Sequence, residues 1–492
     1  MPNAFATLML MLWPIVIWRL FVALPPGRAL IWSLLGAYLL LPPPPAVFDF
    51  PLMPALDKTS LTNLAIVVVA FLVLPQRPKL LPENKIARLL LAVFVLSPVA
   101  TVMGNGEPLV FTQSYIRGLY LQDAVAQPIN NLILVLGFLL ARALLQTPDD
   151  QRDVLVALVL AALAYSVPIL LEVRLSPQLN NWVYGYFQHL FSQTIRGGGY
   201  RPMVFLYHGI WLAYFVLTAL LAALTVWKAA NGRSASKFLI AALYLAIVLV
   251  LCKTLATLVY ASLAAGAILM LRQRTQVRLA MGLAAILLAY PVLKSADVVP
   301  SDAIVAQAET LSAERAQSLS FRIVNEDILF ERAMAKPLFG WGIWGRNHIH
   351  DSTTGEITTV SDGYWIIVIG VWGWVGYIAQ FGLIALPIWL IFREMRHVEP
   401  ASPASGARRR RATPHQSEAL SPFVGPLAVM LGFNMIDLLP NATLTPITWL
   451  IAGTLFGYAE RLAQQRRHPE HQTAPDTSPA TETEADAPRT IL

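Results

Sequence analysis

DVLVALVLAALAYSVPILL, residues 153–171, has one charged residue, at its first position. A helix of this length spans nearly all of the roughly 30 Å apolar core of a bilayer. Comparable apolar runs occupy residues 131–145, 203–227 and 281–293. None of them alternates apolar with polar residues, as the strands of a membrane β-barrel would. The sequence therefore predicts a bundle of membrane-spanning helices.

Composition supports this prediction. The 492 residues are 56% hydrophobic and 13% charged, whereas soluble domains average about 25% charged residues. The one cysteine, Cys252, lies in an apolar run, so an intramolecular disulfide is excluded and a packing role is expected. Residues 1–24 lack a basic region and a cleavage pattern, which predicts a retained helix.

We expect an all-α fold, a polytopic transmembrane bundle of about 12 or 13 helices within residues 1–460. The expected spans lie near residues 5–24, 29–42, 60–75, 87–104, 128–145, 153–172, 203–227, 238–252, 255–271, 279–295, 366–392, 420–438 and 442–459. Lys253 and Thr254 separate two short spans, as a tight hairpin or as a break in one helix.

The net charge of +7 reflects basic connections between spans. Lys and Arg accumulate in cytoplasmic loops, so we place these connections, including a basic loop at 393–419 with Arg408–Arg411, in the cytoplasm. Topology, with contact to membrane lipid, explains this charge better than nucleic-acid binding does. Residues 461–492 are rich in Gln, Pro, Thr and Glu and predict a disordered cytoplasmic tail.

Four segments remain for the outer, periplasmic face: 43–60, 105–130, 174–202 and 295–365. The last is a large, partly helical loop. Residues 303–335 have helix-forming composition, Pro337 ends that region, and residues 337–362 predict irregular structure.

Arg196, the glycines at 197–199, Tyr200 and Arg201 form the first candidate site, just before a helix. Glycine allows close approach of the backbone to a ligand, and arginine matches phosphate or carboxylate oxygens. A flexible loop with interfacial arginines is the alternative. His208 then either faces the same outer vestibule or forms a hydrogen bond within the bundle.

A second candidate site is the helical region with Arg315, Arg322, Glu326 and Arg332. The spacings of seven and four place Arg315, Arg322 and Glu326 on one helical face. A surface helix with a salt bridge would have the same pattern, and it is the favoured interpretation for Arg315 and Arg332. Arg322 has largely apolar neighbours, and a buried guanidinium requires an anionic partner.

The third candidate region runs from Arg346 through His348, His350 and Asp351 to Asp362, with Tyr364 beyond it. Histidine and aspartate can accept a proton from a hydroxyl group. His-x-His with Asp also supplies ligand types for zinc, but no fourth ligand follows at a telling spacing, so a metal site is disfavoured.

Charged residues at membrane depth are costly if they face lipid. Glu172, Lys253 and Asp437 are therefore expected to point into the bundle or to lie at its ends. Lys253, at an outer end, either neutralises a phosphate or extends to the interface.

The order of motifs in residues 320–376 resembles the O-antigen ligase and polysaccharide polymerase superfamily of bacterial inner-membrane glycosyltransferases. The resemblance rests on an arginine, a Pro-Leu-Phe-Gly-x-Gly element, a short polar motif and a glycine-punctuated helix. These are Arg322, residues 337–342, residues 361–364, and Gly370, Gly373 and Gly376. Residues 196–209 are similar to the earlier outer-loop arginine of that family. Ser361 and Asp362 stand where many members carry His-Asn.

The resemblance implies a metal-independent, inverting enzyme of cell-envelope biogenesis that needs no cofactor. It would transfer glycan from an undecaprenyl-pyrophosphate donor to an acceptor hydroxyl at the periplasmic face. Arg201 and Arg322, with Arg196 and Lys253, would bind the pyrophosphate, and His348, His350 or Asp362 would be the base. Tyr200, His208, Glu326 and Tyr364 would line the vestibule. A chain-length regulator or other polysaccharide-assembly proteins would be partners.

Two alternatives stay open. A ligase would move O-antigen to a lipid A-core acceptor, whereas a polymerase would join repeat units of O-antigen or exopolysaccharide. A transporter or flippase predicts internal repeats and helices broken at mid-membrane, which the sequence does not show convincingly.

Overall fold

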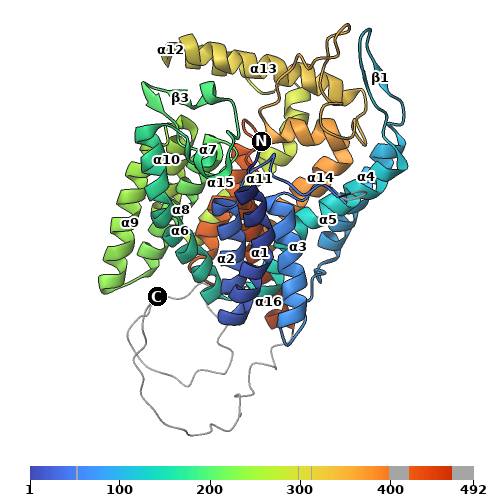
Figure 1. The fold of residues 1–492 in the computed structure, drawn as a ribbon. Helices are drawn as coiled ribbons and strands as arrows, with labels where there is room; N and C mark the ends of the chain where they lie inside the picture. The colour runs from blue at the N-terminus through green and yellow to red at the C-terminus, as the bar shows by residue number, and fades with distance from the viewer. Residues whose placement is uncertain (51–53, 297, 312, 398–419, 468–492) are drawn as a thin grey trace.

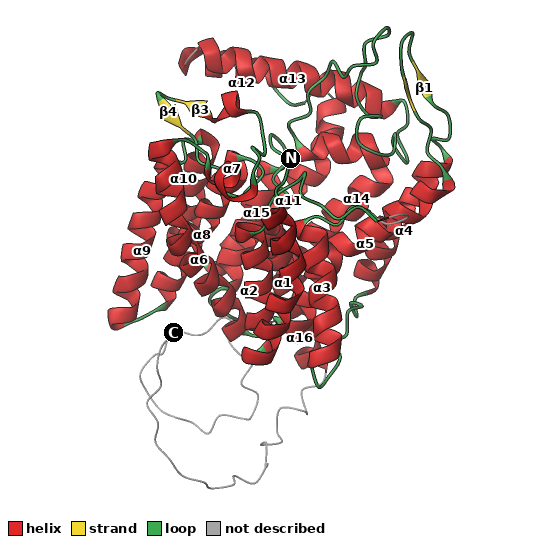
Figure 2. Ribbon diagram, in the orientation of Figure 1, coloured by secondary structure: helices red, strands yellow, loops and turns green. Residues whose placement is uncertain are grey.

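A computed structural model describes residues 1–50, 54–296, 298–311, 313–397 and 420–467. Figure 1 shows a helical bundle with α12 (Ser301–Leu311) and α13 (Ala313–Met334) lying across one end of it. Figure 2 shows that strands occur only as two short hairpins in the part of the chain described. The all-α prediction is confirmed.

Thirteen helices coincide with the thirteen predicted spans. They are α1 (Ala4–Ala23), α2 (Pro26–Leu40), α3 (Lys58–Val73), α4 (Lys85–Met103), α5 (Leu121–Leu144), α6 (Pro148–Leu175), α8 (Gly209–Ala229), α9 (Gly232–Leu251), α10 (Leu255–Met270), α11 (Gln273–Ser295), α14 (Tyr364–Glu394), α15 (Val424–Asp437) and α16 (Pro446–Arg467). The remaining elements are β1 (Leu109–Val110), β2 (Tyr115–Ile116), α7 (Leu179–Tyr184), η1 (Phe191–Thr194), β3 (Ile195–Arg196), β4 (Gly199–Tyr200), α12 (Ser301–Leu311) and α13 (Ala313–Met334).

Eight helices among the described residues are long and apolar enough to cross a membrane: α1, α4, α5, α6, α8, α9, α11 and α14. The other five that match predicted spans are 14 to 22 residues long. The protein is thus a polytopic helical membrane protein. Capping residues mark the starts of several helices. Asp57 caps α3, and Thr147 and Asp150 form a capping box at the start of α6, with Pro148 as its first residue.

Close packing of α16 on α5 depends on two glycines. A Cβ at Gly453 or Gly457 would overlap the backbone of α5. Their spacing of four is the small-residue pattern that lets membrane helices approach closely. A buried ion pair between Arg142 of α5 and Glu460 of α16 joins the same two helices.

The four predicted outer segments meet at one end of the bundle, which we call the loop face. Tyr186 donates a hydrogen bond to the carbonyl of Pro43. Asn105 donates through Nδ2 to the carbonyl of Gly340, 3.0 Å away. These contacts join the first segment to the third and the second to the fourth, so the predicted grouping is confirmed.

Residues 252–254 form a tight hairpin turn, one of the two forms predicted. Lys228, at the end of α8, donates to the carbonyls of Ile268 and Leu269 at the end of α10. Lys253, at the other end of α10, contacts the β3–β4 hairpin on the loop face. Lys253 has a positive φ of 51°, a conformation that reverses the chain between α9 and α10.

The boundaries of the predicted tail need one correction. Helix α16 continues to Arg467, seven residues past the predicted end at 460, because its last turns pack against the bundle through Leu462 and Ala463. Residues 468–492, and residues 398–419 with Arg408–Arg411, lie outside the described residues.

Candidate functional site

The long segment between α11 and α14 is anchored by the Pro-Leu-Phe-Gly-x-Gly element. Trp341 and Gly342 donate backbone hydrogen bonds to the carbonyls of Gly370 and Val371, both at 2.9 Å. Gly340 and Gly373 both have positive φ, and a Cβ at either would overlap the backbone of the other segment. At Gly373 the helical conformation of α14 is interrupted. These glycines therefore fasten the loop into a break in α14.

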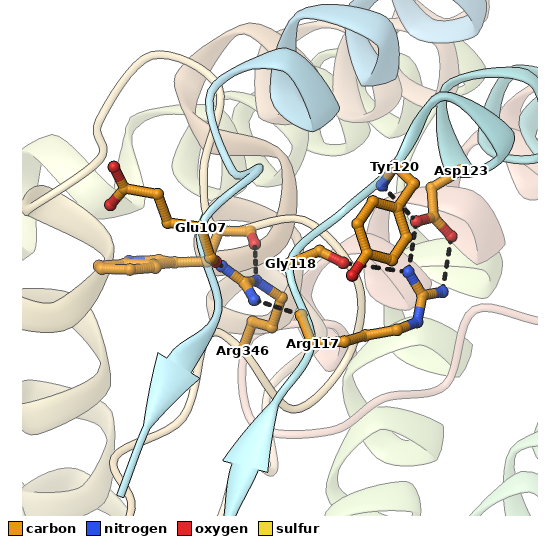
Figure 3. A network of polar contacts seen from close by, with 7 residues as sticks. Glu107, Arg117, Gly118, Tyr120, Asp123 and Arg346 are labelled. Atoms are coloured by element: carbon orange, nitrogen blue, oxygen red, sulfur yellow. Dashed lines mark hydrogen bonds and ion pairs between the residues drawn. The ribbon is translucent and has the colours of Figure 1, made fainter.

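Arg346 fastens the same segment to the β1–β2 hairpin, as Figure 3 shows. Its side chain is 1% exposed and donates to the carbonyls of Arg117 at 2.7 Å and Glu107 at 3.0 Å. Its Nε donates to the carbonyl of Trp341. Arg117 in turn pairs with Asp123 at the start of α5. Arg346 is therefore structural.

Arg201 is the buried cation of the candidate site. It is 5% exposed, and it forms one long hydrogen bond, 3.5 Å from the carbonyl of Lys253. Its Nε is buried without a partner, and among the described residues no carboxylate pairs with it. Burial lowers the pKa of Arg201 to about 10, and the nearby charges of Arg196 and Arg322 act in the same direction. The group remains a cation at neutral pH, with donors available to an anion.

The position of Arg201 depends on its neighbours. A Cβ at Gly209 would overlap its side chain, so this glycine lets the arginine lie across the start of α8. The next residues are held by the carboxylate of Glu172, which accepts hydrogen bonds from the backbone of Met203 at 2.8 Å and Val204 at 2.7 Å. Val204 has a φ of 52°, a strained conformation for a β-branched residue. Glu172 is 1% exposed and points into the bundle, as predicted.

The glycine run forms a hairpin turn. Gly197 and Gly198, both with positive φ, form the two-residue turn of the β3–β4 hairpin. Lys253 donates through Nζ to the carbonyls of Arg196 and Gly197, at 3.0 and 3.3 Å, and a Cβ at Gly199 would overlap this amine. Lys253 thus supports the hairpin. Arg196 extends from the hairpin with its side chain exposed.

Arg322 of α13 has the anionic partner expected for it. Its Nε lies 3.2 Å from Oδ2 of Asp362, and the two side chains are 35% and 36% exposed. Burial is the main cause of the lowered pKa of Arg201 and of His208, and the charge of Arg322 acts in the same direction, so Arg322 lies within electrostatic range of both. Residues more than a hundred positions apart in sequence therefore form one cationic cluster: Arg196, Arg201 and Arg322.

His348 lies beside Ser361, the residue before Asp362. Its ring is 2% exposed, with Nδ1 3.2 Å from the carbonyl of Thr359 and Nε2 3.5 Å from the hydroxyl of Ser361. Nδ1 also lies 3.0 Å from the hydroxyl of Thr359, which can donate or accept. In the tautomer that carries its proton on Nδ1 and donates it to the Thr359 carbonyl, Nε2 presents a lone pair toward Ser361. Burial lowers the pKa of His348 and favours this neutral form.

His350 occupies a different place. Its ring centroid lies 5.2 Å from that of Phe111 in the β1–β2 segment, and its Nε2 is buried without a hydrogen-bond partner. Burial is the main reason that the pKa of His350 is lowered, and the charge of Arg332, which lies 3.3 Å from the ring centroid of Trp341, acts in the same direction. The structure thus separates His350 from the cluster. No group of three His, Cys, Asp or Glu side chains that could hold a metal ion occurs among the described residues.

His208 caps α8. Its Nδ1 accepts a hydrogen bond from the backbone of Ile210 at 3.0 Å, and its Nε2 lies 3.2 Å from Oε1 of Gln193. Burial is the main reason that its pKa falls to about 3. The imidazole is neutral and positions the start of α8 beside Arg201. Tyr200, on β4, is half-buried near Phe191.

Glu326 and Tyr364 have partners inside the bundle. Glu326 accepts from Tyr290 at 3.0 Å and from Trp365 at 3.1 Å, and it lies 3.5 Å from Lys294. Burial raises the pKa of Glu326. The hydroxyl of Tyr364 accepts from Gln380 at 2.8 Å. Glu326 connects α13 to neighbouring helices, whereas the bond of Tyr364 lies within α14. Asp437 is likewise buried, held by Asn441 and Thr443.

Sequence reasoning did not identify Thr359, Gly209 or Gln193. Thr359 orients His348, Gly209 makes room for Arg201, and Gln193 contacts His208. Thr359 and Gln193 are polar residues of ordinary loops, and no pattern distinguishes them. The predicted span 203–227 placed Gly209 inside a helix, whereas α8 begins at Gly209, so the sequence did not single it out.

The cluster can bind a multiply charged anion and can place a hydroxyl group next to a neutral imidazole. No protein-family model matches the sequence, and no curated protein is significantly similar to it. The geometry of the loop face therefore carries the functional argument.

Proposed function

We propose that the protein transfers a glycan from an undecaprenyl-pyrophosphate donor to a hydroxyl group of an acceptor glycan, on the loop face of a bacterial inner membrane. The proposal makes this face periplasmic and the enzyme a polysaccharide polymerase. One observation carries it: Arg201 is a buried cation that lacks a carboxylate partner among the described residues, and it lies within electrostatic range of Arg322. A buried, unpaired charge is costly unless a ligand completes the site.

In this proposal Arg201 and Arg322 hold the pyrophosphate and stabilise the negative charge that develops on it. The acceptor oxygen forms a bond to the anomeric carbon while the bond from that carbon to the pyrophosphate oxygen breaks. The acceptor proton passes through the Ser361 hydroxyl to Nε2 of His348, and undecaprenyl pyrophosphate leaves. Inversion at the anomeric carbon follows from this single displacement.

Asp362 is less suited to be the base, because its carboxylate pairs with Arg322. We assign it to orienting that guanidinium. Arg196 is exposed on a hairpin and can add to the attraction of the donor. The inner-membrane location, the periplasmic orientation and the glycan partners are parts of the same proposal.

The test uses purified protein in detergent or nanodiscs with undecaprenyl-pyrophosphate-linked oligosaccharides extracted from the source cells. We expect longer lipid-linked glycans to form without nucleotide sugar and in the presence of a chelator. If the same extract extends only a lipid A-core acceptor, the protein is a ligase. If neither acceptor is extended, the transferase proposal is wrong.

A matched pair of variants ties the activity to the site. Arg322→Ala should abolish extension, since it removes a cation and releases Asp362. Arg174→Ala, an exposed arginine at the loop-face end of α6, should extend glycans as the unaltered protein does. Equal activity of the two variants would contradict the assignment of Arg322.

A further inference from the structure

A cavity of about 360 Å³ lies on the loop face, apart from the arginine cluster. The segment between α2 and α3, the start of α3, α5, α8 and the start of α16 surround it. Its lining includes Asp57, Asn130, Trp211, Leu444, Thr445 and Trp449. Its volume is in the range of small-molecule sites.

The chemistry of this cavity is unlike that of the arginine cluster. Asp57 is the only charged residue of its lining. Oδ1 of Asp57 caps α3, at 3.0 and 2.8 Å from the backbone nitrogens of Thr59 and Ser60. Oδ2 takes no part in these two hydrogen bonds. A cavity with one carboxylate and no cation in its lining repels phosphate. It favours a neutral ligand that can donate hydrogen bonds.

Two tryptophans add aromatic surface. The indole of Trp211 is fixed by a hydrogen bond of 2.9 Å from Nε1 to the carbonyl of Ala442. Trp449 is 3% exposed, and its Nε1 is buried without a partner. This N–H is closed off from the cavity, so Trp449 contributes wall surface and no donor. An aromatic surface beside a carboxylate and an amide suits a sugar ring.

The cavity is connected to the candidate site through the segment between α15 and α16. Leu444 and Thr445 line the cavity, and Ala442 holds Trp211. The carbonyl of Leu438 accepts a hydrogen bond from the backbone of Tyr364, two residues after Asp362. The segment between α15 and α16 therefore contacts both the cavity and the start of α14.

A series of neighbouring aromatic rings joins Trp211 of α8, in the cavity wall, to His208, the N-cap residue of α8. The ring centroids of Trp211 and Tyr207 are 6.1 Å apart, those of Tyr207 and His189 are 5.5 Å apart, and those of His189 and His208 are 4.7 Å apart. His208 is next to Gly209, over which Arg201 lies. The cavity and the arginine cluster are thus neighbouring parts of one face.

We infer that this cavity binds the acceptor glycan by one of its neutral sugar rings, with Trp211 as the stacking surface and Asp57 and Asn130 as hydrogen-bonding groups. This inference rests on the proposed function. It divides the loop face into a cationic part for the donor pyrophosphate and an uncharged aromatic part for acceptor hydroxyls. Trp211 determines acceptor binding and has no part in breaking the donor bond.

The binding test does not require transfer. Oligosaccharides released by mild acid from the lipid-linked glycans of the source cells are titrated into purified protein without donor, and tryptophan fluorescence is followed. We expect a saturable change that weakens at least about tenfold, roughly 1.4 kcal/mol, in Trp211→Phe and in Asn130→Ala. The control is Trp182→Ala, which alters a 62% exposed tryptophan on α7 and should bind as the unaltered protein does.

Core oligosaccharide is titrated in a second arm, because a ligase would bind core instead of repeat units. Saturable binding of either glycan that depends on Trp211 supports the inference. Binding of neither, or binding unaffected by both substitutions, overturns it.

In the transfer assay, Trp211→Phe should raise KM for the acceptor and leave kcat within about twofold. If transfer occurs with an unchanged KM, the cavity assignment fails while the proposed function stands. If Trp211-dependent binding occurs without transfer, the proposed function fails and the glycan site stands.

Discussion

Arg201 and Arg346 are both buried arginines on the loop face, but the surroundings of their guanidinium groups differ. Arg346 donates to three backbone carbonyls and joins two loops. Arg201 has one long hydrogen bond to a carbonyl and a buried Nε without a partner. The same residue type therefore completes a scaffold in one case and leaves donors for a ligand in the other. The number of guanidinium donors that have acceptors within the protein, rather than burial, distinguishes Arg346 from Arg201.

The largest effect is expected for Arg201→Ala. If Arg201 stabilises the leaving pyrophosphate, its loss should lower kcat by about 100- to 1,000-fold, the range for removal of one electrostatic stabiliser. The melting temperature should stay equal or rise, because an unpaired buried charge is removed. Single-turnover assays and thermal unfolding in detergent measure the two effects. Full activity of Arg201→Ala, or inactivity caused by unfolding, would contradict a ligand-binding role for Arg201 that differs from the structural role of Arg346.

His348 and His350 give a second comparison between two residues of one type with different surroundings. His348→Gln should lower kcat by about 100-fold, since it removes the proposed base, which contributes 10²–10⁴ in comparable enzymes. His350→Gln should change kcat by less than about threefold, because His350 packs against Phe111 away from the cluster. Measurement of kcat for the two variants side by side tests this prediction. The reverse order would assign the base to His350.

Arg346→Ala should act on stability. It leaves the carbonyls of Arg117, Glu107 and Trp341 without their donor, at about 1–3 kcal/mol for each buried group that finds no water. We expect a melting temperature lower by several degrees, and the folded fraction should keep its affinity for the donor. Unchanged stability, or a selective loss of donor affinity, would show that Arg346 belongs to the site.

The smallest expected effect is on the pH profile. Burial lowers the pKa of His348 below its ordinary 6.5, so the folded protein keeps the ring neutral at a pH where the unfolded chain binds a proton. The contribution of this group to stability is complete above pH 6.5 and is lost as pH falls through the folded pKa. The acid limb of kcat should likewise lie below pH 6.5 and should be absent in His348→Gln. An acid limb above pH 6.5 would contradict a buried neutral base.

The bundle was predictable because long apolar runs are a strong signal. The thirteen predicted spans coincide with helices, and the hairpin at Lys253 was one of the two forms expected. The division of the long loop into a helical part and an irregular part after Pro337 is confirmed as well. These features depend on local composition and chain-breaking residues.

The site was only partly predictable, because it depends on contacts between distant segments. The anionic partner of Arg322 was expected, but its identity was not, since Asp362 lies forty residues away while Glu326 lies one helical turn away. Glu326 instead faces Lys294, Tyr290 and Trp365 of neighbouring helices. Lys253 and the glycines at 197–199 serve the hairpin, a role that becomes visible only when α9 and β3 are brought together.

The central claim is that Arg201 and Arg322 form a binding site for a lipid pyrophosphate. The most direct test is a titration of undecaprenyl pyrophosphate, which carries no glycan, into the purified protein and into Arg201→Ala and Arg174→Ala in nanodiscs. We predict saturable binding to the unaltered protein and to Arg174→Ala, and affinity lower by at least about 100-fold, roughly 2.7 kcal/mol, in Arg201→Ala. Equal affinity of all three proteins would contradict the account.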